Sequence, residues 1–410
     1  MAENVPPQSK YQRFHWEKSY GEIPEKWEFV TIGSLFVERK ERSNDTNKYP
    51  LHSFTIEKGV TAKTEQYERS FLLKDKEKNK FALVYLGDFV FNPMNLRFGA
   101  ISMARIDRPV SVSAYYNILV PIADKVDSVF IEALLRSTHV LDLYNKIAIG
   151  SLLEKKRVHL SILERTYVPL PPFEEQCRIG KILALWDTAI EKTVKLIEAK
   201  EKRLKWLTEK LINRECRHWK HLHTKNIFES ISEKKNGNEE LLSVTQDRGV
   251  IPRFMLEGRV MSPEGSTEGY KLIKEGDFAV SLRSFQGGIE YSQYQGLISP
   301  AYTVLRPKLR IHNEFYRHFF KTYIFIEKYL NIAVIGIRDG KQISIPDFMT
   351  VKIPYPPIDQ QNEIAEILNT ARQEIDLLRK QAEAYRKQKL GMMQKLLTGR
   401  WRVKVPEEVS

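Results

Sequence analysis

Two long stretches of the chain place apolar residues at steps of three and four. In the first stretch these residues stand at 179, 182, 183, 186, 189, 190, 194, 197, 204, 207 and 211. In the second they stand at 364, 367, 368, 371, 375, 378, 382, 385, 392, 393 and 396. This spacing, sustained over about five heptads, is typical of a coiled-coil seam. Each stretch predicts a helix of about 40 residues, and each helix needs a partner for its apolar stripe. We expect the two helices to pair with each other.

Both predicted helices begin after a pair of prolines. The segment VPLPPFEEQCRIGKIL (168–183) aligns without a gap with IPYPPIDQQNEIAEIL (353–368). Proline cannot continue a helix and holds the residue before it in an extended conformation, so the prolines define the approach to each helix. The residues that we assign to these helix starts are Pro171, Pro172, Gln176, Pro356, Pro357 and Gln361.

The similarity between the two halves extends far beyond the helix starts. LHSFTIEKGVTAK (51–63) aligns with LLSVTQDRGVIPR (241–253), and LGDFVF (86–91) aligns with EGDFAV (275–280). VSAYYNILVP (112–121) aligns with ISPAYTVLRP (298–307), and the offset drifts only from 192 to 185 residues along the chain. Collinear matches at a domain-sized period indicate a tandem duplication rather than a solenoid of short repeats.

The segments outside the helices predict mostly strands. Runs such as FALVYLGDFVF are rich in β-branched and aromatic residues and are bounded by turn residues. Asp88 and Asp277, each after a glycine, are interpreted as turn or capping residues. FIEALLRSTHVLDLYN (130–145) and the matching region near 315–331 have helical spacing. We therefore predict an α+β fold of two repeated, mostly-β globular domains separated by two long antiparallel coiled-coil helices. The predicted segments are 1–167, 168–215, 216–352, 353–400 and a tail at 401–410.

Composition narrows the classes of function. The 410 residues carry a formal net charge of +13, and the sequence pI is about 9.4. The excess favours a polyanionic partner such as nucleic acid, with a merely basic protein as the alternative. The helical segments 168–212 and 353–400 each have two more basic than acidic residues, so most of the excess lies on the globular parts.

Several other classes of protein are disfavoured by the same sequence. Two cysteines are too few for a disulfide framework or a cysteine-based zinc site, and no acidic or cysteine residue at ligand spacing accompanies His218, His221 and His223. No apolar run has the length of a membrane span, and the first residues do not form a signal peptide, so we expect a cytoplasmic protein. The motifs of P-loop, Rossmann, zinc-protease and serine-hydrolase sites are missing, and Asn92-Pro93 only partly matches the methyltransferase loop.

The doubled pattern Pro-x-Pro-Pro-x-x-(Asp/Glu/Gln)-Gln-x-x-Ile-x-x-Ile-Leu resembles the DNA-specificity subunit of type I restriction–modification systems. The resemblance covers nearly the whole chain, and the Gly-Asp-Phe turns and the Ser-x-x-Tyr blocks (Ser113 and Tyr116; Ser299 and Tyr302) share it. Cys177 and Gly180 depart from the usual helix-forming residues.

The resemblance implies a non-catalytic chain that binds double-stranded DNA at a bipartite, asymmetric site. It implies two methyltransferase subunits as partners, with restriction subunits in the full complex. No cofactor is expected on this chain, since S-adenosylmethionine, ATP and Mg²⁺ belong to the partner subunits. Two readers held by paired helices would read two half-sites at a fixed spacing, as dimeric DNA-binding proteins do.

Base reading uses forked donors and amides in loops beside the repeated blocks. Each such residue has solvated surface charge as its alternative interpretation. Tyr11, Phe14 and Trp16 stack on bases in one interpretation and pack on the first domain in the favoured one. The proposed DNA-contacting residues are Lys58, Lys63, Asn95, Arg97, Arg105, Lys155, Lys156, Arg157, Gln246, Arg248, Arg253, Arg283, Gln286, Arg338, Lys341 and Gln342.

Two rival functions remain from the residues. One is the DNA-reading part of a fused restriction–methylation enzyme, which the missing catalytic motifs disfavour. The other is a purely structural coiled-coil adaptor, which does not account for two basic, domain-sized repeats. Activity with S-adenosylmethionine separates the first rival, and DNA binding separates the second.

Overall fold

The computed structural model describes residues 7–62, 80–151, 156–234, 239–256, 267–281, 288–336 and 342–403. The chain divides into two compact units. Unit 1 comprises Met1–Lys192 together with Ala382–Ser410, and unit 2 comprises Thr193–Gln381. The division falls within both long helices, so each unit contains part of each helix.

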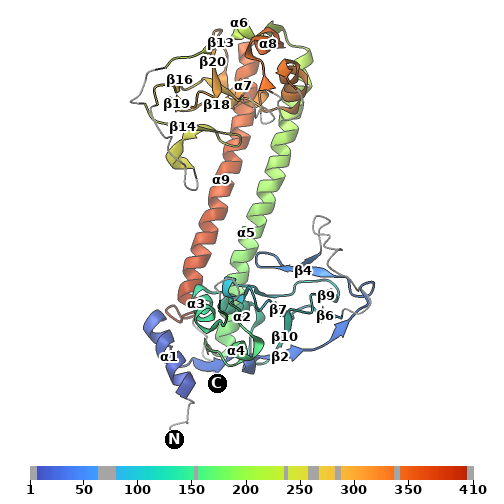
Figure 1. The fold of residues 1–410 in the computed structure, drawn as a ribbon, viewed down its shortest axis with the longest axis vertical. Coiled ribbons are helices and arrows are strands. Elements are labelled where there is room, and N and C mark those ends of the chain that lie inside the picture. Colours follow the sequence, from blue (N-terminus) through green and yellow to red (C-terminus); the bar gives the residue numbers. More distant parts are fainter. Residues whose placement is uncertain are drawn as a thin grey trace, which may run out of the picture. The chain divides into compact units, whose positions relative to one another are not determined.

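The largest sheet of unit 1 is antiparallel and has the strand order β2-β10-β7-β8. Figure 1 labels β2, β10 and β7 of this sheet. A three-stranded sheet β3-β6-β9, the hairpin β4-β5 and the pair β1-β11 complete the strands. Their bounds are β1 (Glu28–Thr31), β2 (Phe36–Arg39), β3 (Arg42–Ser43), β4 (His52–Thr55), β5 (Gly59–Ala62), β6 (Phe81–Val84), β7 (Phe89–Phe91), β8 (Ile101–Met103), β9 (Val110–Val112), β10 (Asn117–Pro121) and β11 (Tyr167–Leu170).

Unit 2 repeats this plan. Its four-stranded sheet has the order β13-β20-β17-β18, and the pairs β14-β15, β16-β19 and β12-β23 correspond to β4-β5, β6-β9 and β1-β11. A further pair, β21-β22, lies near the end of the unit. The bounds are β12 (His221–His223), β13 (Phe228–Ile231), β14 (Leu242–Thr245), β15 (Gly249–Pro252), β16 (Lys271–Ile273), β17 (Phe278–Ser281), β18 (Glu290–Tyr291), β19 (Gly296–Ile298), β20 (Tyr302–Pro307), β21 (Val334–Ile335), β22 (Gln342–Ile343) and β23 (Lys352–Pro354).

Strand register confirms the duplication at single-residue precision. Phe36 stands opposite Pro121 in unit 1, and Phe228 stands opposite Pro307 in unit 2. The neighbouring strands agree as well, because Phe89 faces Leu119 and Phe278 faces Leu305. The α+β class and the repeated mostly-β domains are therefore confirmed.

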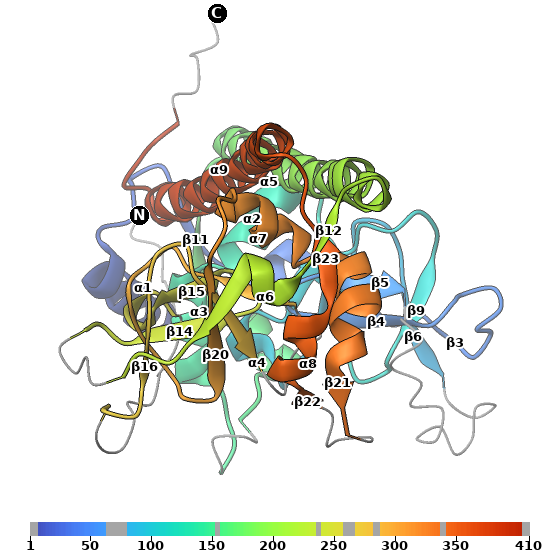
Figure 2. The same ribbon diagram turned by 90° about the horizontal axis from the view of Figure 1, so that it is seen from above.

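The short helices pack beside these sheets. In unit 1 they are α1 (Pro7–Tyr20), η1 (Ile32–Leu35), η4 (Leu96–Phe98), α2 (Ser128–Leu135), α3 (Thr138–Ile147) and α4 (Leu160–Glu164). In unit 2 they are η7 (Glu215–Arg217), α6 (Thr224–Ile227), η8 (Arg253–Met255), α7 (Asn313–Phe319), the π-helix η10 (Phe325–Leu330), η11 (Asn331–Ala333) and α8 (Ile345–Thr350). Helices α6 and α8 lie next to β12 and β23 (Figure 2).

The predicted helical run at 130–145 is divided into two helices by a local cap. α2 ends before Arg136, and the Ser137 side chain accepts a hydrogen bond from the Val140 amide to begin α3. A side chain that satisfies a free amide at a helix start stabilises a new helix there, typically by about 1 kcal/mol. The periodicity was thus predicted correctly, while the break required the cap geometry.

The two long helices are α5 (Phe173–Thr208), which continues as the π-helix η6 (Glu209–Asn213), and α9 (Ile358–Leu396). Both lie inside the predicted segments 168–215 and 353–400. The exact domain limits stay a prediction, because the contact-based division cuts through these helices.

Within each unit the helices pair in antiparallel fashion. In unit 1 the Trp186 ring packs edge-on against Tyr385, with centroids 5.7 Å apart, and Lys389 pairs with Asp187. In unit 2 the ion pairs are Lys200 with Glu374 and Arg379 with Glu201. The expectation that the two helices pair with each other is confirmed within both units.

Trp186 and its counterpart Ala371 give the helix pair different packing in the two units. In unit 2 a cavity of about 360 Å³ lies beside Ala371 and Lys200, the residues that match Trp186 and Tyr385. The small alanine therefore leaves open, in unit 2, the space that the two aromatic rings fill in unit 1.

Each unit has a large core at the helix start and a smaller core among the strands. In unit 1 the first half of α5 contributes Ile179 and Leu183 to the large core, which also contains Phe130 and Leu397. In unit 2 the start of α9 contributes correspondingly, with Ile364 and Leu368 buried beside Phe315. The long helices are thus anchored in the domains by their own first turns.

Candidate nucleic-acid interface

The glutamine of the repeated helix start ties the long helix to the preceding domain. In unit 1 the Gln176 side chain is 1% exposed. Its Oε1 accepts a hydrogen bond from the Asp127 amide at 3.0 Å, and its Nε2 donates to the carbonyls of Pro171 (2.9 Å) and Lys125 (3.2 Å). One side chain therefore satisfies three backbone groups that the packing of α2 against α5 removes from solvent.

Unit 2 contains the same arrangement. The Gln361 side chain is fully buried, accepts from the His312 amide at 2.9 Å and donates to the Pro356 carbonyl at 2.8 Å. The second proline of each pair takes part through its own carbonyl, because Pro172 accepts the Gln176 amide and Pro357 accepts the Gln361 amide. The six helix-start residues thus form one joint in each unit.

Gly180 is explained by this joint. A Cβ at position 180 would overlap the Oδ1 atom of Asp127, the side chain that caps α2 by accepting from the Phe130 amide. The matching residue in unit 2 is Ala365, and no side-chain cap is present on α7 there. The departure from the usual helix formers therefore provides room for a cap.

The Gly-Asp turns place a buried carboxylate directly before an inner strand of each large sheet, β7 in unit 1 and β17 in unit 2. Asp88 is 2% exposed, accepts the Tyr85 amide at 2.9 Å and binds the Arg39 guanidinium through two hydrogen bonds of 2.8 and 3.0 Å. The hydrogen bonds to Asp88 raise the pKa of Arg39, and burial opposes this rise with a smaller effect. Asp88 is therefore a capping residue, as predicted, and also the partner of a charged side chain.

Asp277 repeats the cap with an arginine from another strand. Its carboxylate accepts the Lys274 amide at 2.9 Å and binds Arg306 on β20 at 2.7 Å. Arg306 also bonds to Glu233 at 2.6 Å, whereas in unit 1 the arginine comes from β2. Both units thus neutralise the same buried aspartate, and they do so from different sequence positions.

The hairpins β4-β5 and β14-β15 present exposed basic and amide side chains. Lys58 lies in the first turn, and Gln246 and Arg248 lie in the second, where all three are exposed. Lys58 and Arg248 occupy matching positions, and their amides donate to Thr55 and Thr245 at 3.1 and 3.2 Å. These two turns are the best-defined places in the structure where predicted DNA-contacting residues of the two units correspond.

Arg97 and Arg105 take part in internal contacts, as does Arg248, whose Nη1 atom donates to a main-chain carbonyl at 3.0 Å. Arg97 is 8% exposed, lies over the Phe98 ring and donates to Asn145 at 3.5 Å. Arg105 binds the buried Glu132 carboxylate through both of its terminal nitrogens. A guanidinium must leave these partners before it can contact a base, and the assignment of Arg97 and Arg105 to DNA contact stays a prediction.

The other described candidates differ in accessibility. Asn95 and Gln342 are exposed, whereas Lys156, Arg157 and Arg253 are half-buried. The remaining candidates lie outside the described residues, and their assignment stays a prediction: Lys63, Lys155, Arg283, Gln286, Arg338 and Lys341.

The aromatic side chain of Trp16 packs on the first domain. It is 4% exposed within the large core of unit 1, and its ring lies 6.1 Å from that of His139. The favoured interpretation is confirmed for Trp16, while the side chains of Tyr11 and Phe14 lie outside the described residues.

The structure also identifies polar residues that pattern reasoning missed. Arg39, Arg306 and Glu132 form buried or half-buried charge pairs with partners 27 to 49 positions away in sequence. A charge inside an apolar helical run, as at Glu132, was the one available signal of such a pair.

Among the described residues no group of three or more His, Cys, Asp or Glu side chains is arranged to hold a metal ion. Every helix in the described part of the chain is too short or too polar to cross a bilayer.

Comparison with known proteins identifies relatives over both repeats. The family model described as "Type I restriction modification DNA specificity domain" matches residues 24–201 and again residues 219–384. The "Putative type I restriction enzyme MjaX specificity subunit" of Methanocaldococcus jannaschii is 25% identical over 437 residues, covering 96% of this chain and 98% of that protein.

Solved structures share the fold at lower identity. The type I restriction–modification S subunit from M. genitalium superposes with a TM-score of 0.54 at 16% identity, covering 93% of this chain and 97% of that one. A chain from a study of assembly and conformational transition in the type I R-M system gives a TM-score of 0.53 at 14% identity, covering 93% and 100%. These likenesses extend to the whole two-unit chain.

Proposed function

This chain belongs to the type I restriction modification DNA specificity family, and we propose that it is the DNA-reading subunit of a type I restriction–modification complex. The observation that carries the proposal is the doubled family match, one over each repeat, together with the same buried glutamine joint in both units. The joint attaches a long helix to each globular domain in the same way.

Each globular domain reads one half of a bipartite DNA target in this proposal. The matching turns differ in the side chains they present, with Lys58 in one and Gln246 and Arg248 in the other. Lysine and arginine at a shared position serve phosphate contact, whereas an unshared amide such as Gln246 suits adenine. The two half-sites therefore differ in sequence.

The partners and chemistry follow from the same proposal. The paired helices α5 and α9 set the distance between half-sites and dock two methyltransferase subunits, and restriction subunits complete the assembly. S-adenosylmethionine, ATP and Mg²⁺ bind those partners, and this chain performs no catalytic step. A missing catalytic motif and the excess of basic residues in the sequence of the globular parts support this division of labour.

Methylome sequencing tests the function directly. A host that expresses the chain with its methyltransferase partner is expected to carry one bipartite motif, methylated on both strands. A host that expresses the partner alone is the control and should lack that methylation. Methylation that does not depend on the chain, or a single undivided motif, would contradict the proposal.

A second experiment tests the helices as a spacer. Matched seven-residue deletions from the middle of α5 and of α9 shorten the pair by about 10 Å, at about 1.5 Å per residue. That length equals roughly three base pairs at about 3.4 Å each. The spacer should shrink by about this amount while both half-sites keep their sequence; altered half-sites would refute a spacing role.

The alternative of a fused restriction–methylation enzyme is separated by a simple assay. The purified chain is incubated with DNA and labelled S-adenosylmethionine, with and without the methyltransferase subunit. Methyl transfer by the chain alone would establish the alternative, and transfer only in the presence of the partner supports the proposed reading role.

A further inference from the structure

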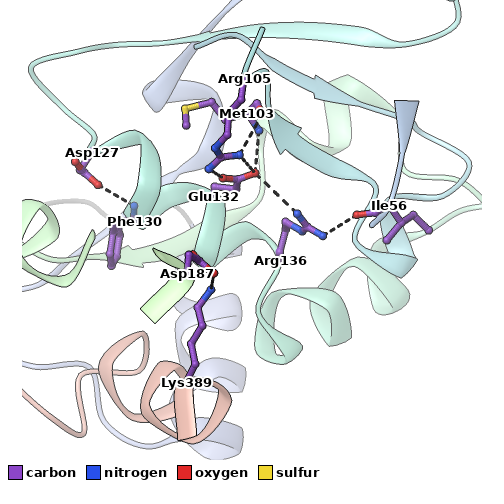
Figure 3. Close-up of polar contacts among 9 residues, drawn as sticks. All are labelled: Ile56, Met103, Arg105, Asp127, Phe130, Glu132, Arg136, Asp187 and Lys389. Carbon is purple, nitrogen blue, oxygen red and sulfur yellow. Dashed lines mark hydrogen bonds and ion pairs between the residues drawn. The ribbon is translucent and has the colours of Figure 1, made fainter. Parts of the chain in front are cut away.

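A basic side chain at the end of α2 reaches the turn of the β4-β5 hairpin in unit 1. The Arg136 Nη2 atom donates to the Ile56 carbonyl at 2.8 Å (Figure 3). Its Nη1 atom lies 3.9 Å from the Glu132 carboxylate, which also binds Arg105 and accepts the Met103 amide at 3.0 Å. The hairpin turn is therefore connected to α2 and β8 through one charge cluster.

Unit 2 makes the corresponding contact with a different cation. The Lys321 Nζ atom, just after α7, donates to the Gln246 carbonyl at 3.1 Å and pairs with the buried Glu290 carboxylate. A second cation supports the same turn, because Arg372 on α9 donates to the Asp247 carbonyl at 3.3 Å. Here the hairpin turn is held both by the domain and by the long helix.

The two contacts are at the same place in the repeated fold. Ile56 and Gln246 both follow the last residue of the first hairpin strand, because Thr55 faces Gly59 and Thr245 faces Gly249. Arg136 and Lys321 are separated by the 185 residues that separate Gln176 and Gln361. The cation and its carbonyl acceptor therefore correspond in both units.

The carboxylate that accompanies the cation does not correspond. Glu132 belongs to α2 and is matched by Arg317, whereas Glu290 belongs to β18 and is matched by Ser102, since Val90 faces Ser102 and Ala279 faces Glu290. Two sequences that differ in the origin of the counter-charge retain the same cation-to-turn contact. The retained feature is thus the support of the turn rather than a particular ion pair.

We propose that Arg136 and Lys321 are positioning residues that hold the hairpin turns in the conformation that reads DNA. The inference rests on the proposed function, because it assigns each turn to the reading of one half-site. Each cation binds a main-chain carbonyl directly before the exposed turn residues, which are Glu57 and Lys58 in unit 1 and Asp247 and Arg248 in unit 2. Removing the cation takes away one support of the turn without deleting any side chain that faces solvent from the hairpin, and in unit 2 the Arg372 contact remains.

A direct phosphate contact is the competing role for these two cations, since their side chains are 32% and 30% exposed. The two roles differ in salt dependence. A lost phosphate contact lowers the slope of log affinity against log salt by about 0.9. A lost positioning contact leaves the slope unchanged and lowers the sequence preference of one half-site.

The experiment uses the full chain with its methyltransferase subunits and duplexes carrying the motif found by methylome sequencing. Arg136→Met is expected to weaken binding about tenfold, the typical effect of one charge-assisted hydrogen bond. The tenfold loss should vanish on a duplex in which the half-site read by unit 1 is scrambled. It should persist on a duplex in which the other half-site is scrambled. Arg136→Lys should restore most of the binding, and Lys146→Met, an exposed change on α3, is the matched control.

Lys321→Met should give the same pattern for the opposite half-site, with a smaller loss because Arg372 still binds the Asp247 carbonyl. This change leaves the buried Glu290 without its lysine, so the double variant Glu290→Gln with Lys321→Met removes both charges and keeps the test valid if the single variant does not fold. Lys321→Arg is the conservative rescue. Arg136→Met needs no such companion, because Glu132 keeps its Arg105 partner.

Four outcomes would overturn the inference alone. In the first two, Arg136→Met and Lys321→Met bind DNA as tightly as Lys146→Met does, or lose the same affinity on every duplex. In the other two, the slope of log affinity against log salt falls by about one, or both variants affect the same half-site. A wild-type complex that binds all duplexes equally would instead overturn the proposed function, and the inference with it.

Discussion

Replacing Gln361 with leucine should destabilise unit 2 by about 3 kcal/mol. The change removes the acceptor of the His312 amide, 2.9 Å away, and the donor to the buried Pro356 carbonyl, 2.8 Å away. An unsatisfied buried polar group costs about 1–3 kcal/mol, and we assign roughly 1 to the half-buried amide and roughly 2 to the carbonyl. For a domain of this size the loss corresponds to a fall in Tm of about 6–12 °C.

The assay is differential scanning calorimetry of the full chain, with hydrogen exchange of the 305–320 region to assign the change to unit 2. Asn362→Ala, at the exposed neighbouring position, should change stability by less than about 0.5 kcal/mol. Gln176→Leu should produce a loss at least as large in unit 1, where three hydrogen bonds depend on one side chain. If Gln361→Leu behaved like Asn362→Ala, the glutamine would not be the joint that the structure indicates.

Three further predictions concern buried charged or titratable groups. Burial lowers the pKa of His318 from 6.5 to about 4, so the neutral ring stabilises the fold above pH 6.5, and this contribution of about 3 kcal/mol should be lost as the pH falls through about 4. The urea midpoint should fall less between pH 7 and 4 for His318→Gln than for the unchanged protein. Equal dependence of the two midpoints on pH would contradict this. Arg402→Ala leaves the 2%-exposed Glu175 side chain without its cation and should destabilise unit 1 by about 2 kcal/mol. Adding Glu175→Gln should recover most of that stability, because unit 2 carries a glutamine at the matching position. If thermal melts of the double variant showed no recovery, the charge argument would be refuted. Asp277→Asn weakens the bond to Arg306 and should lower the stability of unit 2 by about 2 kcal/mol in chemical denaturation, whereas an effect on unit 1 would show that the turns are not independent.

The long helices and their starts were predictable because their signals are local. A stripe at steps of three and four requires a helix, and a proline pair prevents the helix from beginning earlier. The Gly-Asp turns were equally local, since Gly87 and Gly276 adopt φ values of 86° and 89° that other residues rarely adopt. The duplication itself needed only the alignment of the chain with itself.

The accessibility of the predicted DNA-contacting residues followed from the sequence only in outline. Patterns identified basic and amide residues in the loops, and Lys58, Gln246 and Arg248 are indeed exposed on hairpin turns. The same patterns selected Arg97 and Arg105, whose guanidinium groups are directed into contacts within unit 1. Sequence spacing does not reveal that Arg105 contacts a carboxylate 27 residues away in the chain.

The sequence by itself determined that the chain has two copies of one domain, each followed by a long helix that begins at a proline-bounded joint. Tertiary structure alone decided what the charged residues do, because the partner of each charge is brought to it by packing of distant elements. Asp88 and Asp277 show the difference: both turns follow from Gly-Asp, yet one aspartate binds an arginine from β2 and the other an arginine from β20. Backbone preferences act between neighbours in sequence. Burial makes an unpaired charge costly, so the buried aspartate needs a cation in both units, and the fold decides which strand provides it.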